Sequence, residues 1–292
     1  MQPVVNLGRS AGFSVVTLLL ILLAASVARA DVTYGDLAPG ARGYGEQTGV
    51  AAEICRDHLF DPASSPARLP VGYRLLTAAE YGKDDPAVAA LLAKEPRYAS
   101  YAVGSLCFMI SDTFDVDGVA AHPSGPIPMA FWWAHARTTE AVAPDPRKKG
   151  SQQWLQLASW YSDKGTDQAR IRAIDPMAQF VAVGVAQVEP QLWRLRLPLG
   201  NGMVEAEVRT DGKRIRRKKP EPGFMTVPFT GDSAHLFTVF TYFGHHHQAA
   251  EGAWRATGAG PFSTSFAIEP VAFPTFFQDG WQARFGLYDV AR

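Results

Sequence analysis

The sequence predicts a mainly β protein, built as one antiparallel barrel or sandwich with one or two short helices near its N-terminus. Three observations lead to this prediction. About ten short segments after Arg97 are rich in aromatic and β-branched residues. Turn sequences that contain glycine separate them. A single segment, which begins after Asp85, carries both helix start and helix stop signals.

The first 30 residues have the pattern of a secretory signal peptide. Arg9 supplies positive charge, residues 15–27 are almost wholly apolar, and an Ala-Arg-Ala sequence ends at Ala30. No cationic cluster follows that would retain a membrane anchor. We therefore expect a signal peptide over residues 1–30 and a single mature domain over residues 31–292. The exported domain would be periplasmic or secreted, without stable membrane insertion after cleavage.

Charge and composition exclude one class of partner. Removing Arg9 and Arg29 with the signal peptide leaves 26 basic and 28 acidic residues. A slightly acidic chain lacks the surplus cations that phosphate binding needs, so nucleic acid is not expected as a partner. Apolar residues make up 47% of the chain, enough for a packed core. The oligomeric state is left open.

The two cysteines, Cys55 and Cys107, are expected to form a disulfide, because a single pair in an oxidising compartment is most simply bridged. Two buried thiols are the alternative. A metal site made by these cysteines alone is not expected, because zinc needs more ligands.

The elements before Arg97 are few. Residues 31–49 are rich in glycine and predict a loose arm, and residues 50–59 predict a short helix that carries Cys55. Residues 62–70 are rich in proline and predict an extended segment. The clear helix follows, with Asp85 as N-cap, Pro86 in the first turn and Pro96 as terminator.

The remaining chain predicts strands. Turns at Asp117-Gly118, residues 200–202, Asp211-Gly212, residues 231–232 and Asp279-Gly280 separate them. One strand shows clean alternation, with apolar Trp193, Leu195 and Leu197 between Arg194 and Arg196. The predicted strands cover residues 98–109, 127–136, 154–161, 180–188, 192–199, 203–209, 224–229, 236–243, 263–268 and 281–290.

Three stretches resemble the acetoacetate decarboxylase-like family. They are the helix and strand over residues 87–110, the central hairpin over residues 185–208 with its Gly200-Asn201-Gly202 turn, and the last strands, with Phe224 to Pro228 and Trp281 to Phe285. The resemblance implies a β-barrel or cone that encloses a small-molecule cavity. It also implies a Schiff-base lysine beside a second lysine, ahead of the central hairpin.

The segment that matches the lysine pair reads Asp175-Pro176-Met177-Ala178-Gln179-Phe180 and contains no lysine. Lys148, Lys149 and Lys164 lie in predicted loops. We therefore expect an exported small-molecule-binding protein without imine-based decarboxylation and without a cofactor. Arg170, Arg172 and Glu189 are the nearest charged groups and are candidate ligand anchors. A cavity enzyme, a lyase or hydrolase acting on a small oxo compound, is the alternative. No catalytic residue is assigned.

A metal site is the third alternative. His245 and His247 would share one face of a continued strand and could chelate zinc or copper with a third donor. The candidate donors are His122, His135, His235, Asp115 and Asp117. A solvated turn is the competing interpretation of the histidine run. The basic run over residues 213–219 is interpreted as a solvated hairpin, with docking to an anionic surface as its alternative.

Overall fold

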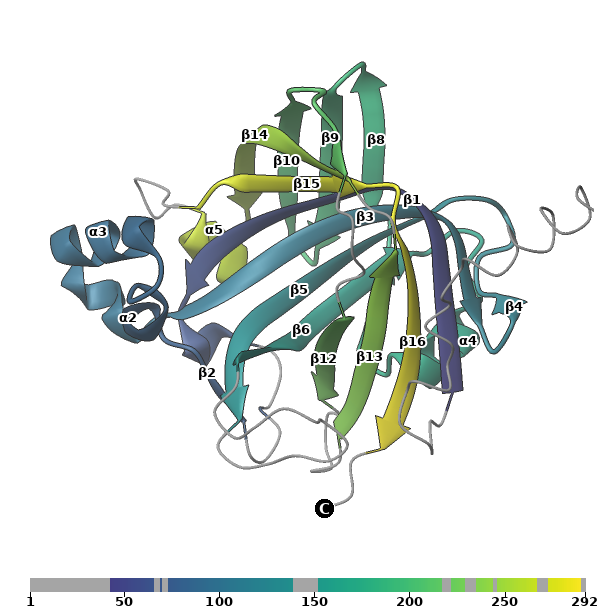
Figure 1. Ribbon diagram of the computed structural model, residues 1–292, viewed down its shortest axis with the longest axis horizontal. Helices are drawn as coiled ribbons and strands as arrows, with labels where there is room; N and C mark the ends of the chain where they lie inside the picture. Colours follow the sequence, from purple (N-terminus) through teal and green to yellow (C-terminus); the bar gives the residue numbers. More distant parts are fainter. Residues whose placement is uncertain are drawn as a thin grey trace, which may run out of the picture. The chain divides into compact units, whose positions relative to one another are not determined.

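Four long antiparallel strands form the centre of the computed structural model, which describes residues 43–65, 69, 73–138, 152–216, 222–228, 235–243, 246–266 and 273–289. They are β1 (Gly43–Phe60), β3 (Ala102–Val116), β5 (Ile127–Thr138) and β6 (Gln152–Ser162), which run side by side in Figure 1. β1 pairs with β3 along almost its whole length, from Gly45 to Phe60. Bulges at residues 50–52 of β1 and 132–133 of β5 shift the register.

β1 belongs to two groups of strands. One edge pairs with β3, and the other pairs first with β16 (Gln282–Asp289) and then with β15 (Thr275–Asp279). From β6 the pairing continues through β12 (Pro222–Pro228) and β13 (His235–Phe243) to β16, and so returns to β1. β6 and β12 share two residue pairs, and that contact is parallel. The prediction of a mainly β fold is confirmed. Because β15 and the strands beyond it lie outside this circuit of pairings, the sheet as a whole is not closed, and "barrel" is only an approximate description.

The second group continues from β15 as an arm with a free edge. It runs through β14 (His246–Thr257), β10 (Gly202–Thr210) and β9 (Leu192–Leu199) to β8 (Gly184–Glu189), as Figure 1 shows. The predicted alternation in β9 is confirmed: Trp193, Leu195 and Leu197 are buried, whereas Arg194 and Arg196 are exposed and pair with Glu207 and Glu205.

Short elements complete the chain. The helices are α2 (Ala78–Tyr81), α3 (Pro86–Lys94), α4 (Gln168–Ile174) and α5 (Pro261–Ser265), with 3-10 turns η2 (Pro62–Ser64) and η3 (Pro96–Ser100). The short strands are β2 (Tyr73–Leu75), β4 (Val119–Ala120), β7 (Ala178–Val181) and β11 (Ile215–Arg216). The predicted helix is confirmed as α3, with Asp85 accepting hydrogen bonds from the amides of Ala87 and Val88. No described helix is both long and apolar enough to cross a bilayer.

Several sequence predictions were wrong. Residues 50–59 form the second half of β1 instead of a helix, and residues 43–49, predicted as a loose arm, form its first half. Fourteen register pairs with β3 override the helix propensity of this alanine- and glutamate-containing segment. Residues 263–265 belong to α5, because Pro261 is pre-organised for a first helical turn. The strand predicted over residues 180–188 is broken between β7 and β8, and α4 and β15 were not predicted.

Candidate functional site

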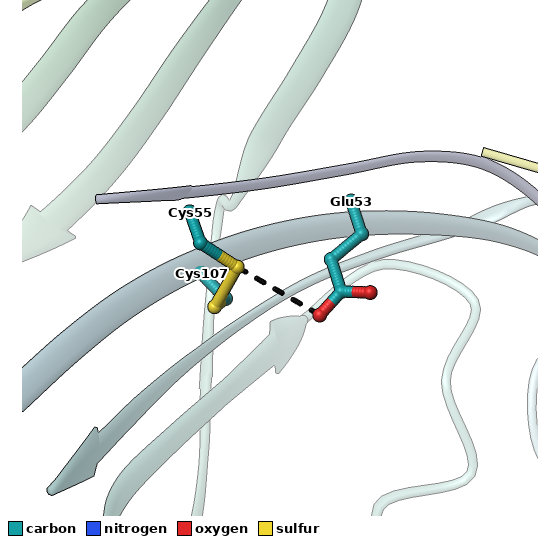
Figure 2. Close-up of side chains that lie close together, drawn as sticks. All are labelled: Glu53, Cys55 and Cys107. Carbon is teal, nitrogen blue, oxygen red and sulfur yellow. Dashed lines mark hydrogen bonds between the residues drawn. A yellow bond between two sulfur atoms is a disulfide. The ribbon is translucent and has the colours of Figure 1, made fainter. Parts of the chain in front are cut away.

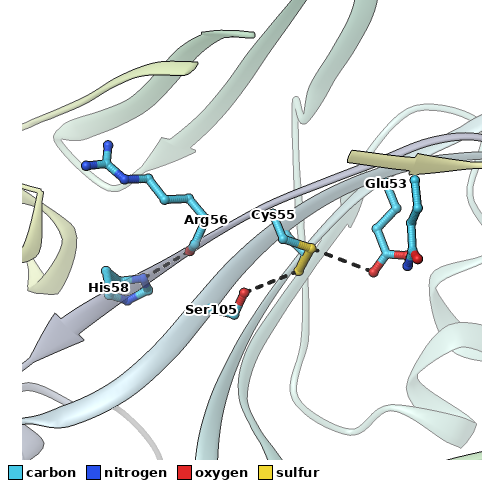
Figure 3. Close-up of a disulfide and its surroundings, with 7 residues drawn as sticks. Glu53, Cys55, Arg56, His58 and Ser105 are labelled. Atoms are coloured by element: carbon cyan, nitrogen blue, oxygen red, sulfur yellow. Dashed lines mark hydrogen bonds between the residues drawn. A yellow bond between two sulfur atoms is a disulfide. The ribbon is translucent and has the colours of Figure 1, made fainter. Parts of the chain in front are cut away.

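The two sides of β1 carry different chemistry. Glu53, Cys55 and Asp57 point to one side, whereas Arg56 and His58 point to the other, as Figure 3 shows for four of these residues. Register places Ser105 and Cys107 of β3 directly opposite Asp57 and Cys55. We call the side with Glu53, Cys55, Asp57, Ser105 and Cys107 the cystine face. The opposite side, which carries His58, Phe60, Trp132 and Trp160, is the aromatic face.

The predicted disulfide between Cys55 and Cys107 is confirmed. The two residues are opposite partners in neighbouring antiparallel strands, with Cα atoms 4.0 Å apart. Both are buried, with exposed fractions of 7% and 1%. The bridge joins residues 52 positions apart in the sequence, so it links β1 to β3 across the intervening helices α2 and α3.

Glu53 is a buried carboxyl group beside this disulfide. Its Oε1 lies 3.7 Å from the Sγ of Cys55 (Figure 2), and its Oε2 accepts a hydrogen bond from the Gln278 amide. Trp281 also donates to this carboxyl. Burial raises the pKa of Glu53 to about 7, against the opposing effect of these two donors. Because a disulfide sulfur carries no hydrogen, any hydrogen bond to sulfur here must use the proton of the carboxylic acid.

Asp57 is the second acid on the cystine face. Burial raises its pKa to about 6, the Ser105 hydroxyl opposes the shift, and the nearby Asp85 carboxylate adds to it. The Ser105 Oγ also lies 3.7 Å from the Cys107 Sγ (Figure 3). Two acids with raised pKa values therefore flank one disulfide.

Residues 175–180, which the family resemblance led us to compare with its lysine pair, begin with a buried carboxyl group. Asp175 follows α4, and its Oδ2 accepts hydrogen bonds from the Gln156 amide at 2.9 Å and the Tyr161 hydroxyl at 3.0 Å. Its Oδ1 accepts from the backbone amide of Met177 at 3.1 Å. Burial raises the Asp175 pKa, although these donors and the nearby Ser159 hydroxyl favour the carboxylate.

Strand register places the Asp175 network on the same side of the sheet as the disulfide. Cys107 lies opposite Phe131 of β5, and Phe131 lies opposite Ser159 of β6. Residues opposite one another share a face, so Ser159 is two strand spacings, or about 10 Å, from the cystine. The packing between them is apolar, with Met109, Met129 and Phe131 in one buried cluster.

The predicted ligand anchors do not belong to the cystine face. Arg170 is half-buried on α4 and pairs with Asp167 at 3.4 Å. Arg172 is exposed, with its guanidinium 4.7 Å from the centre of the Phe180 ring. Glu189 is exposed at the end of β8, opposite Leu192. Their role in ligand binding stays a prediction.

Of the predicted metal ligands, His245 lies outside the described residues. His247 is the second residue of β14, where it lies opposite Gln278, with its ring centre 5.1 Å from that of Phe276. Both ring nitrogens of His122 face backbone carbonyl oxygens, at 2.7 and 2.9 Å. Within the described part of the chain, the one group of three potential ligands is Glu53, Cys55 and Cys107.

A pocket opens on the aromatic face, with a volume of about 200 Å³. Trp132 and Trp160 form its wall on the sheet side, and Phe262 of α5 packs 4.9 Å from Trp132 between ring centres. Trp133, the next residue, faces the other side of β5 and stacks on Phe131. The polar groups of the lining are the side chains of Ser64, Gln179, Thr257 and Ser263.

The indole N–H groups of Trp132 and Trp160 are buried without a hydrogen-bond partner among the described residues. An unpaired buried donor costs free energy, roughly 1–3 kcal/mol.

The acids Glu53 and Asp57 were not predicted as site residues. Glu53, Cys55 and Asp57 are alternate residues, so assigning the segment to a strand would have placed all three on one face. In the sequence, Asp175 stood out only as the first residue of the segment 175–180, which contains no lysine.

No protein-family model matches the sequence, and no curated protein matches it. Solved structures do resemble it. The acetoacetate decarboxylase of Legionella pneumophila subsp. pneumophila str. Philadelphia 1 is 14% identical, with a TM-score of 0.50 over 86% of this chain and 88% of that chain.

Two further structures have TM-scores below 0.5. An acetoacetate decarboxylase-like enzyme from Sphingomonas wittichii RW1 is 9% identical, with a TM-score of 0.44 over 88% of this chain and 94% of that chain. The enduracididine biosynthesis enzyme MppR, complexed with pyruvate, is 11% identical, with a TM-score of 0.46 over 89% and 93%. Sequence identities as low as these indicate a similar fold and say nothing about function. The Legionella structure therefore supports one conclusion: this chain has an acetoacetate decarboxylase-like fold.

Proposed function

We propose that this chain is an exported protein that binds a small carbonyl compound or carboxylate, and that it does so without forming an imine. The observation that carries the proposal is the pocket on the aromatic face, where tryptophan walls surround a few neutral polar groups. Apolar walls with a small number of polar anchors are typical of small-molecule sites.

The size and chemistry of the pocket restrict the ligand. A volume of about 200 Å³ suits a compact molecule rather than a long chain or an oligosaccharide. Among the described lining residues, the Gln179 amide can donate to a ligand, because the hydroxyls of Ser64, Thr257 and Ser263 already donate to backbone carbonyl oxygens. An amide donor recognises an acceptor oxygen, as a carbonyl or carboxylate group provides.

The absence of imine chemistry is supported by Asp175. An imine requires an unprotonated amine beside the carbonyl carbon. The segment over residues 175–180 offers the Asp175 carboxyl group, which accepts hydrogen bonds from Gln156, Tyr161 and the Met177 amide. The lysines of the described residues are all exposed: Lys83, Lys94, Lys164 and Lys213.

Binding is tested by thermal unfolding with a panel of small oxo acids, carboxylates, lipids and sugars. A ligand at a hundredfold excess over its Kd stabilises the folded state by about 2.7 kcal/mol. Trp160→Phe replaces an indole of the pocket wall by a smaller ring and so removes apolar contact with the ligand, which should weaken binding several-fold. The control is Trp193→Phe, a buried tryptophan that does not line the pocket.

The result that contradicts the binding proposal is a panel without any shift, or equal ligand affinity in both tryptophan variants. The imine question has a separate test. Borohydride reduction in the presence of acetoacetate should leave the protein mass unchanged, and a lysine adduct in the mass spectrum would overturn that part of the proposal.

Export is proposed from the sequence, on the strength of the apolar segment before Asp31 and the cystine pair. Expression of the full chain followed by cell fractionation tests it. The mature protein should begin at Asp31 by N-terminal sequencing and be absent from the cytoplasm, and an intact Met1 N-terminus in the cytoplasm would contradict export.

A further inference from the structure

The cystine face contains a group of ligand atoms that the disulfide keeps from binding a metal. One oxygen of Glu53 and the sulfurs of Cys55 and Cys107 all lie within 4.8 Å of one another (Figure 2). The two cysteines alone would be too few ligands for zinc, and Glu53 supplies the third. Figure 2 shows the carboxyl group turned toward the bridge from its own position on β1.

The spacing suits tetrahedral zinc. With Zn–S bonds of about 2.3 Å and Zn–O bonds of about 2.1 Å, tetrahedral angles put neighbouring ligand atoms roughly 3.5–3.8 Å apart. The Oε1 of Glu53 is 3.7 Å from the Cys55 Sγ, within this range. The sulfurs, once reduced, need only separate to a similar distance, which rotation about their Cα–Cβ bonds allows at opposite positions of neighbouring strands.

A second layer of hydrogen bonds holds the ligands in place. The Gln278 amide binds Oε2 of Glu53 from β15, which leaves Oε1 directed at the sulfurs. The Ser105 hydroxyl approaches the Cys107 sulfur at 3.7 Å. Donors of this kind orient metal ligands and are part of the design of protein metal sites.

Burial shields this group of atoms from water. Glu53 has an exposed fraction of 2%, and the groups that act on it in the described part of the chain are neutral donors, Gln278 and Trp281. A divalent ion bound here would hold the Glu53 carboxyl group in its ionised form.

We propose that Glu53, Cys55 and Cys107 form a redox-switched zinc site, which is closed when the disulfide is intact and open when a dithiol reduces it. The dithiol gives two electrons and two protons to the cystine and becomes a cyclic disulfide itself. Zinc then displaces to solvent the two thiol protons, and the carboxyl proton where Glu53 carries one, and binds the carboxylate as its third ligand. This leaves one position for water or a bound molecule. The proposal is independent of the pocket on the aromatic face.

The test uses the full mature chain, prepared oxidised and after reduction with a dithiol that is then removed under argon. Cobalt(II) serves as the probe, because thiolate ligands give it an intense charge-transfer absorption. The reduced protein should bind one equivalent of cobalt with this absorption, and zinc should displace it. The oxidised protein should show no thiolate absorption.

Three variants locate the site. The double variant Cys55→Ala, Cys107→Ala should lose the absorption. Glu53→Gln keeps both thiols but should weaken cobalt and zinc affinity about tenfold or more, as loss of one ligand predicts. Asp57→Asn, a matched change of the neighbouring acid on the same face, should bind as the unmodified chain does.

The proposal is overturned if the folded, reduced protein gives no thiolate absorption with cobalt, or if Glu53→Gln binds as tightly as Asp57→Asn. Circular dichroism of the reduced chain, measured with and without zinc, shows whether that chain is folded when its metal binding is tested. Zinc should raise the unfolding temperature of the reduced protein and leave that of the oxidised protein unchanged. A reduced chain that is unfolded in both conditions contradicts the proposal as well.

Discussion

His58 is a titratable side chain surrounded by aromatic rings. It lies on the aromatic face, with ring centres of Phe262 and Phe266 at 5.5 Å and Trp132 at 6.2 Å. Its Nδ1 is 3.4 Å from the Arg56 carbonyl oxygen, and its Nε2 has no partner among the described residues. Burial lowers the pKa of His58 to about 3, so the folded protein holds this imidazole neutral.

This histidine should make the fold sensitive to acid. Between an unfolded pKa of 6.5 and a folded pKa of about 3, the unfolded chain binds the extra proton. The free energy of unfolding therefore falls as the pH falls through that window, by an amount on the order of 4 kcal/mol. His58→Phe, which fits the aromatic surroundings, should flatten the decline.

Urea unfolding at a series of pH values between about 6.5 and 3 measures the effect. Phe60→Leu is the control, because it changes packing beside His58 without removing a titratable group. It should lower stability by a similar amount at every pH. Parallel pH curves for His58→Phe and the unmodified chain would show that the imidazole is not the sensing group.

At the scale of elements, α3 depends on one side chain at its start. Asp85 accepts hydrogen bonds from two backbone amides at 2.9 and 3.0 Å, and Pro86 fills the first turn. The helix packs Val88 and Leu91 into the buried cluster that contains Leu59 of β1. Loss of the cap would therefore weaken the packing of α3 against Leu59 of β1.

Asp85→Ala should lower the free energy of unfolding by about 1 kcal/mol, because two helix amides lose their acceptor. Asp84→Ala removes an exposed carboxylate one residue earlier that does not cap the helix, and should have an effect within about 0.5 kcal/mol of zero. The measurement is the urea midpoint of each variant. Equal midpoints for the two alanine variants would contradict the role of the cap.

Elements with local signals were predictable, and elements set by distant contacts were not. The capped helix after Asp85 and the alternating strand β9 follow from neighbouring residues alone. The strand over residues 50–59 was missed because both faces of β1 are largely buried and both carry charged or titratable residues, so the sequence shows no alternation of apolar and polar positions. Its partner β3 also lies about 50 residues away. Pro261 is a local helix signal at the start of α5.

The residues of the candidate site also divide into those that local sequence predicts and those that only distant contacts bring together. The cysteine pair was predictable from the count of cysteines and the expected compartment. The acids Glu53 and Asp57 could be recognised only with the correct strand assignment. The pocket on the aromatic face joins Trp132 and Trp160 to Phe262, about 100 residues further on, and sequence periodicity does not predict such a contact.

At the scale of the whole fold, β1 is the strand that both groups of the sheet share. It pairs with β3 on one edge and with β16 and β15 on the other (Figure 1). Folding must bring β1 and β3 together across the helices α2 and α3, and the disulfide fixes this pairing in the unfolded chain as well. The bridge therefore acts mainly by restricting the unfolded state.

Reduction of Cys55–Cys107 should lower the free energy of unfolding by about 4 kcal/mol, the chain-entropy value for a loop of 52 residues. Urea unfolding with and without a reducing agent measures it, with a chelator present so that bound zinc cannot compensate. The double alanine variant of the two cysteines should match the reduced chain in both conditions. A reduced chain within about 1 kcal/mol of the oxidised one would mean that the unfolded chain keeps β1 and β3 together without the bridge.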